Sequence, residues 1–284
     1  MTGIETGRVA VITGSTGRVG AAVTRSLSRA GYSLVLTAPS MEKLSALASQ
    51  LTGPCTVIEG NLRDESLPET LLYAALDRFG RCDVCFNNGA LFEAGIIETV
   101  DIERLSSMVR VNVEGSFRVA YVFLKHFVSE GAGHLVNVSS AVGSSSRPTT
   151  YAATQRAIEV LSDALAAELC DGEILVSCIQ PGLVKTGLHH RWEIEGATGS
   201  GYALEPEDFA RMVLFILEHP GARNRAEKPD SMRLPRGTSD EAPSKFPAGA
   251  AKEGSDETPA THNWEFDDEG ADGGSDEEII QDEI

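Results

Sequence analysis

Tyr151 and Gln155 stand four residues apart in a stretch whose apolar pattern predicts a helix, so their side chains share one face of it. A tyrosine hydroxyl can give a proton, and it titrates ordinarily near pH ~10. The glutamine amide can hydrogen-bond a hydroxyl group but carries no charge, so it cannot stabilise a tyrosinate. The pair therefore favours proton donation over proton abstraction.

A second group of residues could hold a phosphate. Glycines at positions 14, 17 and 20 follow an apolar run and open an amphipathic stretch, and glycine permits positive φ and a close approach of the backbone. The N-terminus of the helix would supply free N–H groups and the positive end of its dipole. The segment predicts a nucleotide site, as opposed to a glycine turn without ligand, at Gly14, Ser15, Thr16, Gly17, Arg18, Val19 and Gly20.

The residues after the second strand discriminate NAD from NADP, because an acid there would bind the ribose of NAD and repel a 2′-phosphate. Residues 37–40 contain no acid, and Arg18 in the glycine loop could approach such a phosphate. The sequence therefore favours NADP over NAD. The alternative is that Arg18 is simply an exposed arginine at the start of a helix.

Short β-branched runs alternate with amphipathic stretches up to about residue 220. This pattern predicts an α/β fold, a Rossmann-type doubly wound parallel sheet in a single domain of residues 1–220. Strands are expected at Val9–Thr13, Leu34–Thr37, Thr56–Glu59, Val84–Asn87, His134–Val138 and Leu175–Ile179. Helices are expected at Val19–Ala30, Met41–Leu51, Ser66–Phe79, Ile102–Ser129, which should divide near Asn112, Tyr151–Leu169 and Pro206–Glu218.

Residues 221–284 are predicted to form a disordered acidic C-terminal tail, because they are rich in Pro, Gly, Ser, Asp and Glu and poor in aliphatics. Thirteen acidic residues and no Lys or Arg fall within 253–284, which leaves −5 of the formal net charge of −18 for the rest. Such acidity disfavours nucleic-acid binding. Asn263–Phe266 is either a short partner-binding motif or an incidental aromatic pair.

Sequence features that are not found also limit the class of protein. No apolar run reaches the roughly 18 residues of a membrane span, and residues 1–8 do not read as a secretory signal. Five cysteines without an export signal indicate a reducing, cytoplasmic setting. Cys82 and Cys85 are expected on opposite faces of a strand, as structural residues. No group of residues has the spacing of metal ligands.

Several motifs, in this order, resemble those of the short-chain dehydrogenase/reductase superfamily, from about Arg8 to Leu217. After the glycine loop, Asn61-Leu62 matches a pair that contacts adenine in the family, and Asn87-Asn88-Gly89-Ala90 occupies the place of an NNAG motif. Four further matches are Asn112, Ser140, Tyr151 and the segment Pro181-Gly182-Leu183-Val184-Lys185-Thr186.

The chain departs from the family pattern along the cofactor site. The glycines have the spacing of the family's extended branch, the last two residues of NNAG are exchanged, and an aspartate is replaced by Asn61. The catalytic lysine is replaced by Gln155. Ser140 and Tyr151 are about two residues closer than usual, and no final strand is evident after the last helix.

The resemblance implies roles for the matching residues. Tyr151 would exchange the proton, Ser140 would hold the substrate oxygen, and Asn112 would hold a relaying water. Gln155 would occupy the lysine's place beside the ribose. Each has a structural alternative: Ser140 as a turn cap, Asn112 as the bridge of a helix kink, Tyr151 as a packed aromatic.

Two other groups could assist the proton transfer. Arg156 could replace the lysine's charge, although it lies about 100° further around the helix. His189 and His190 lie where the family has a substrate lid, and are either acid–base groups or exposed loop residues.

The favoured function is an NADP-dependent oxidoreductase that reduces a carbonyl of a small organic molecule. Two alternatives stay open: a catalytically impaired regulator that binds a nucleotide or a partner, and a non-redox cyclase, dehydratase or isomerase. The resemblance also implies a homo-oligomer, a dimer or a tetramer.

Overall fold

A computed structural model of the protein describes residues 7–93, 97–140, 149–170, 172–181, 184–185 and 204–219. The predicted domain boundary at residue 220 and the predicted tail lie outside these residues and stay predictions. The same holds for His189, His190 and the segment Asn263–Phe266.

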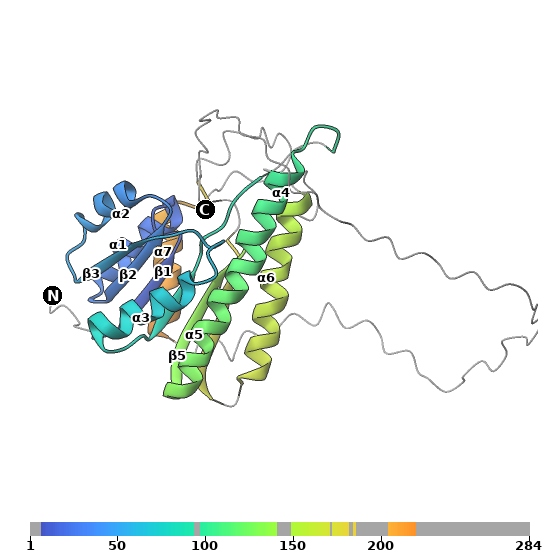
Figure 1. Ribbon diagram of the computed structural model, residues 1–284. Helices are drawn as coiled ribbons and strands as arrows, with labels where there is room; N and C mark the ends of the chain where they lie inside the picture. Colours follow the sequence, from blue (N-terminus) through green and yellow to red (C-terminus); the bar gives the residue numbers. More distant parts are fainter. Residues whose placement is uncertain are drawn as a thin grey trace, which may run out of the picture. The chain divides into compact units, whose positions relative to one another are not determined.

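Parallel strands form one six-stranded sheet in the order β3-β2-β1-β4-β5-β6 (Figure 1). The chain adds strands outward from β1 in one direction, to β3, and then in the other direction, from β4 to β6, so the strand order reverses between β1 and β4. In such sheets ligands bind beyond the carboxyl ends of the strands at that point. The predicted doubly wound parallel sheet is confirmed. The strands are β1 (Val9–Thr13), β2 (Ser33–Ala38), β3 (Cys55–Glu59), β4 (Val84–Asn87), β5 (Ala132–Val138) and β6 (Glu173–Ile179).

Helices cover both faces of the sheet. They are α1 (Arg18–Arg29), α2 (Met41–Ala48), α3 (Leu67–Phe79), α4 (Ile102–Val109), α5 (Ser116–Glu130), α6 (Thr149–Glu168) and α7 (Pro206–Glu218). Among the described residues no helix has the length and apolar character needed to cross a membrane.

Two hydrophobic clusters lie on opposite faces because successive strand residues alternate in direction. Ala10 and Ile12 of β1 pack with residues of α1, α2 and α7. Val9 and Val11 of the same strand pack with residues of α3, α5 and α6. The sheet is therefore buried on both faces, which holds its carboxyl ends as a rigid platform.

The long helical stretch divides at the predicted place. A π-helix, η1 (Arg110–Gly115), separates α4 from α5 and contains Asn112. π-Helices occur mostly as short bulges, often at functional sites. In Figure 1 the green helices α4 and α5 run on from one another beside the yellow-green α6, and η1 packs against α6.

Helix α2 ends at Ala48, before the predicted Leu51. The cause is a tertiary contact: the Ser28 hydroxyl of α1 accepts hydrogen bonds from the backbone N–H groups of Thr52 and Gly53, at 3.1 and 3.2 Å. These bonds turn the chain away from the helix and towards β3.

The prediction that Cys82 and Cys85 lie on opposite faces is wrong. Both belong to the cluster under α3 and α5. Cys82 precedes β4, which begins at Val84, so the alternation of a strand does not apply to it. Burial raises the pKa of Cys82 from 9.0 to about 12, which agrees with a structural thiol.

Candidate active site

The glycine loop joins β1 to α1 in the geometry of an anion site. Gly14 has a φ of +60°, which only glycine adopts readily. Position 20 has room only for glycine, because a Cβ there would lie 2.0 Å from the Gly14 carbonyl oxygen. Gly17 is the N-cap of α1 and offers no side-chain cap, and the first turn of the helix has no acid. The N-terminus of α1 thus presents backbone N–H groups and the positive end of its dipole.

The other residues of the loop lie at different depths. Ser15 is fully buried, and its hydroxyl donates to the Thr37 carbonyl oxygen at 3.2 Å, so it ties the loop to β2. Val19 packs in the core. Thr16 is half-buried and Arg18 is exposed. The Arg18 guanidinium donates to the Lys185 carbonyl oxygen at 3.4 Å.

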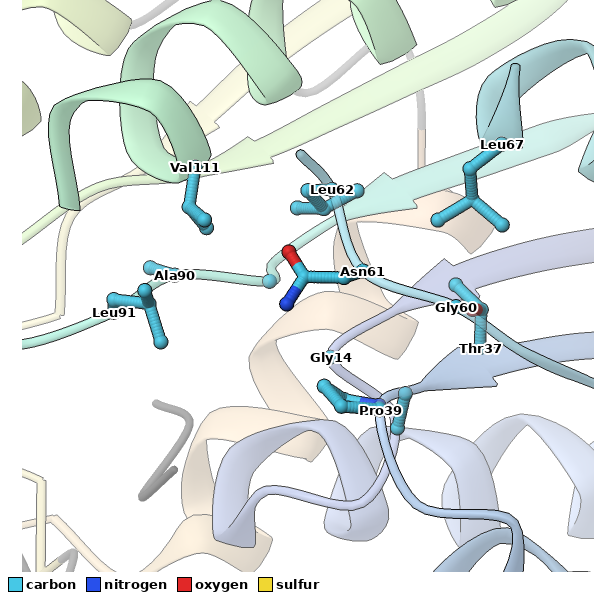
Figure 2. A pocket seen from close by; sticks show the side chains of 12 residues that line it. Gly14, Thr37, Pro39, Gly60, Asn61, Leu62, Leu67, Ala90, Leu91 and Val111 are labelled. Atoms are coloured by element: carbon cyan, nitrogen blue, oxygen red, sulfur yellow. The ribbon is translucent and has the colours of Figure 1, made fainter. Parts of the chain in front are cut away.

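A shallow pocket lies beside the loop at the carboxyl ends of the strands, with about 330 Å³ of empty space that includes open solvent. In Figure 2 the Asn61 amide extends into the space between Leu62 and Pro39. The pocket thus brings together Asn61, Leu62, Gly14 and Gly89 of the predicted cofactor residues. Its lining is Gly14, Thr37, Ala38, Pro39, Gly60, Asn61, Leu62, Leu67, Gly89, Ala90, Leu91 and Val111.

The segment after β4 is fastened to the glycine loop by Thr13. The Thr13 hydroxyl accepts hydrogen bonds from the N–H groups of Asn88 and Gly89, at 2.9 and 3.0 Å. The Asn88 amide donates to the carbonyl oxygens of Thr13 and Gly14. A Cβ on Gly89 would lie 2.8 Å from a methyl carbon of Leu62 and 3.3 Å from the Gly14 nitrogen, so a larger residue there would require the Leu62 side chain to shift.

These residues fit a dinucleotide. A Cβ on Gly14 would lie 2.7 Å from the Gly89 Cα, so the two segments can come this close only with glycine at position 14. Thr37 lines the pocket, and its hydroxyl oxygen is buried and has no hydrogen-bond partner among the described residues. A buried polar atom without a partner is costly, and the hydroxyl of a bound nucleotide would satisfy it.

Tyr151 and Ser140 meet at the end of β5. Tyr151, in the first turn of α6, is 2% exposed, and its hydroxyl forms a side-chain hydrogen bond with Ser140. Its ring packs edge-on against Phe92, with centroids 4.9 Å apart. Burial raises the pKa of Tyr151 above its ordinary value of 10.0, and the bond to Ser140 offsets part of this rise. The hydroxyl therefore stays protonated at neutral pH.

Asn112 clamps three parts of the site together. Its amide oxygen accepts from the Leu91 N–H at 2.7 Å, and its amide nitrogen donates to the Leu91 carbonyl oxygen at 2.8 Å and to the Thr154 hydroxyl at 3.1 Å. Thr154 in turn donates to the Tyr151 carbonyl oxygen at 2.7 Å. The π-helix thus holds both the pocket wall and the first turn of α6.

Gln155 is 3% exposed on α6, and no residue in the described part of the chain hydrogen-bonds its amide. Arg156 does not direct its charge towards Tyr151. Its side chain is 72% exposed and pairs with Glu159, because a step of one residue turns it away from the face of Tyr151 and Gln155. Pro181 is buried just after β6, whereas Gly182 and Thr186 lie outside the described residues.

Sequence reasoning missed several residues that the fold brings to the site: Thr13, Thr37, Phe92, Thr154 and Glu159. Thr13 ends β1 and Thr37 is the last residue but one of β2, so threonine near the carboxyl end of a parallel strand is the available signal. Glu159 accepts a hydrogen bond from the Ser139 hydroxyl at 3.0 Å while buried. No local pattern marks that contact. Across the described ranges no cluster of His, Cys, Asp or Glu could hold a metal ion.

Comparison with known proteins agrees with this geometry. Residues 8–195 match the family model for short chain dehydrogenase. The chain is similar to an uncharacterized oxidoreductase of Staphylococcus epidermidis, with 29% identity over 219 residues, 76% of this chain and 94% of that protein. An uncharacterized oxidoreductase of Staphylococcus aureus is 28% identical over 220 residues, 76% of this chain and 94% of that one.

Solved structures share the fold. A 3-ketoacyl-(acyl-carrier-protein) reductase from Brucella melitensis, complexed with NADH, has a TM-score of 0.68 at 24% identity, covering 74% of this chain and 90% of that one. Actinorhodin polyketide ketoreductase with NADPH has 0.67 at 24%, covering 76% and 92%. A metagenomic short-chain oxidoreductase in complex with NADP has 0.63 at 27%, covering 74% and 90%.

Proposed function

The chain belongs to the short-chain dehydrogenase family, and from that premise we propose that it reduces a carbonyl group of a small organic molecule with a nicotinamide dinucleotide. The observation that carries the proposal is the buried hydrogen bond between Tyr151 and Ser140. A protonated tyrosine next to a second hydroxyl can supply both the proton and the hydrogen bond that a developing alkoxide needs.

Each part of the site has a separate role in the proposed reaction. The N-terminus of α1 and the pocket around Asn61 bind the nucleotide, which when bound supplies the hydride. Ser140 donates a hydrogen bond to the substrate oxygen, and Tyr151 gives that oxygen its phenolic proton. Gln155 offers its amide to a ribose hydroxyl, and Asn112 keeps the first turn of α6 in register with the pocket wall.

The raised pKa of Tyr151 favours one direction of reaction. Carbonyl reduction needs the protonated hydroxyl, which is the form that burial stabilises. Alcohol oxidation needs a tyrosinate, and Gln155 brings no charge to stabilise it. We therefore expect reduction at neutral pH and slow oxidation. The names of the relatives support oxidoreductase chemistry. A carbonyl substrate is proposed by analogy with the reductases among the solved structures of the same fold.

The test is turnover of a panel of ketones and aldehydes by the purified full chain, followed by the loss of reduced-nicotinamide absorbance. Tyr151→Phe removes the proton donor and should lower kcat by about 10²-fold or more. Tyr121→Phe, at a tyrosine of α5 that is 48% exposed, is the matched control and should leave kcat unchanged.

Two outcomes would contradict the proposal. If neither NADH nor NADPH binds in calorimetric titration, the dinucleotide site is refuted. If a nucleotide binds but Tyr151→Phe turns over as fast as the unaltered chain, Tyr151 is not the proton donor. Binding without turnover of any carbonyl would favour a regulatory protein, and product formed without consumption of nucleotide would favour a non-redox enzyme.

A further inference from the structure

Glu59, at the end of β3, lies next to two residues that line the pocket, although it is not itself part of the lining. Glu59 is the last residue of β3, and its carboxylate accepts a hydrogen bond from the Met41 N–H at 3.1 Å. In the parallel register Glu59 lies opposite Ala38, the last residue of β2. Ala38 and Gly60 both line the pocket, so Glu59 is adjacent to that lining on each side.

This position matters because dinucleotide folds read the 2′ position of the adenosine ribose at the end of the second strand. An acid there accepts a hydrogen bond from the 2′-hydroxyl, and a cation there binds a 2′-phosphate. The second strand of this chain ends without an acid, at Thr37-Ala38-Pro39-Ser40. Glu59 brings a carboxylate to the same edge from the neighbouring strand.

The N-terminus of α2 faces this edge but has little capacity left for a phosphate. A helix N-terminus binds anions through free N–H groups, yet the Met41 N–H is bonded to Glu59 and the Lys43 N–H is bonded to the Ser40 hydroxyl at 3.3 Å. Glu42 adds a second carboxylate in the first turn. With Lys43 as the cation of this helix, the local formal charge is still negative.

Arg18, the cation that the sequence offers for a 2′-phosphate, is held elsewhere. Its guanidinium donates to the carbonyl oxygen of Lys185 in the segment that follows β6. The Lys185 ammonium in turn pairs with Glu205. Neither cation lines the pocket, and neither adjoins Ala38 and Gly60 as Glu59 does.

We propose that Glu59 selects NAD over NADP, by accepting a hydrogen bond from the adenosine 2′-hydroxyl and by repelling a 2′-phosphate. The inference rests on the proposed dinucleotide site and differs from the NADP preference that the sequence predicts from Arg18. A phosphomonoester carries about −1.5 to −2 charges at neutral pH, so the same carboxylate that favours one nucleotide disfavours the other.

The experiment is calorimetric titration of the full chain with NADH and with NADPH. The unaltered chain should bind NADH at least about tenfold more tightly, since a hydrogen bond to a charged group is worth about one factor of ten or more. Glu59→Gln keeps an acceptor for the Met41 N–H, so the start of α2 is preserved. It should bring the two dissociation constants within roughly threefold of each other, mainly by strengthening NADPH binding.

Glu69→Gln is the matched control. Glu69 lies in the first turn of α3 and is exposed, so the change removes the same charge from another helix start. It should leave the ratio of the two affinities unchanged. If Glu59→Gln does not fold, the unaltered chain still tests the proposal: added salt should narrow the gap between NADPH and NADH, because screening weakens repulsion at an exposed carboxylate.

The outcomes separate the two proposals. If neither nucleotide binds, the dinucleotide site itself is wrong and the role of Glu59 falls with it. If both bind and the unaltered chain prefers NADPH, the assignment of Glu59 is wrong while the site stands. The assignment of Glu59 is also wrong if Glu59→Gln and Glu69→Gln show the same ratio of NADPH to NADH dissociation constants.

Discussion

Replacement of Gln155 by lysine tests whether charge, not shape, has set the direction of this site. Gln155 and Tyr151 are 3% and 2% exposed and four residues apart on α6. A lysine there places a cation on the face that carries the tyrosine hydroxyl. We expect Gln155→Lys to lower the pKa of Tyr151 and to increase alcohol oxidation much more than carbonyl reduction.

The magnitude follows from Coulomb's law. Side chains four apart on a helix are separated by about 6 Å, and at an effective dielectric constant of about 20 two unit charges then interact by about 3 kcal/mol. One pKa unit corresponds to about 1.4 kcal/mol, so the pKa of Tyr151 should fall by about two units. The lysine loses hydration in this buried place, which makes two units an upper value.

The assay is a spectroscopic pH titration of tyrosinate absorbance, which needs no knowledge of the substrate. The signal of Tyr151 is isolated by subtracting the same titration of Gln155→Lys with Tyr151→Phe. The matched control is Gln155→Met, which has similar length and no charge. In Gln155→Met the pKa of Tyr151 should stay raised, as burial dictates.

One result would refute this reasoning. If Tyr151 titrates at the same pH with lysine and with methionine at position 155, the charge does not act on the hydroxyl. Stronger nucleotide binding in Gln155→Lys without any change in the titration would then assign position 155 to ribose binding alone.

Three further expectations concern stability. Asn112→Ala leaves the N–H and carbonyl groups of Leu91 without their partner, so urea unfolding should show a loss of about 2–4 kcal/mol. Gly20→Ala forces a Cβ to within 2.0 Å of a backbone oxygen; thermal unfolding should show a loss of about 1–3 kcal/mol, with weaker nucleotide binding. Cys82 has a pKa raised from 9.0 to about 12. The free energy of unfolding should therefore keep its full Cys82 contribution below about pH 9 and fall between pH 9 and 12, and this fall should be less steep in Cys82→Ala.

The sheet and most helix boundaries could be predicted because they depend on local patterns. In β1, Val9 and Val11 face one cluster and Ala10 and Ile12 the other, which is the alternation that the sequence displays. The break near Asn112 was also foreseen from the sequence, and the structure explains it: the asparagine amide satisfies backbone groups of Leu91, and the π-helix presents it there.

Contacts between distant segments could not be predicted. The bond from the Met41 N–H to Glu59 joins residues 18 apart in sequence, and it depends on the register of β2 against β3. Cys82 lies on the same side as Cys85 because β4 begins two residues later than a continuous strand would. In both cases the spacing of residues along the chain does not show which residues of other segments they contact.

Buried polar bonds hold the site in place without a contribution from residue 155. The Asn87 amide donates to the Asn137 amide oxygen at 3.0 Å, and the Asn137 amide donates to the Ser162 hydroxyl at 2.9 Å. This chain of bonds ties β4 and β5 to α6, and Asn112 ties the pocket wall to the same helix through Thr154. Gln155 takes no part in either set of bonds. The position of Tyr151 is therefore fixed independently of residue 155, and a lysine at that position would change the chemistry of the site while its geometry is retained.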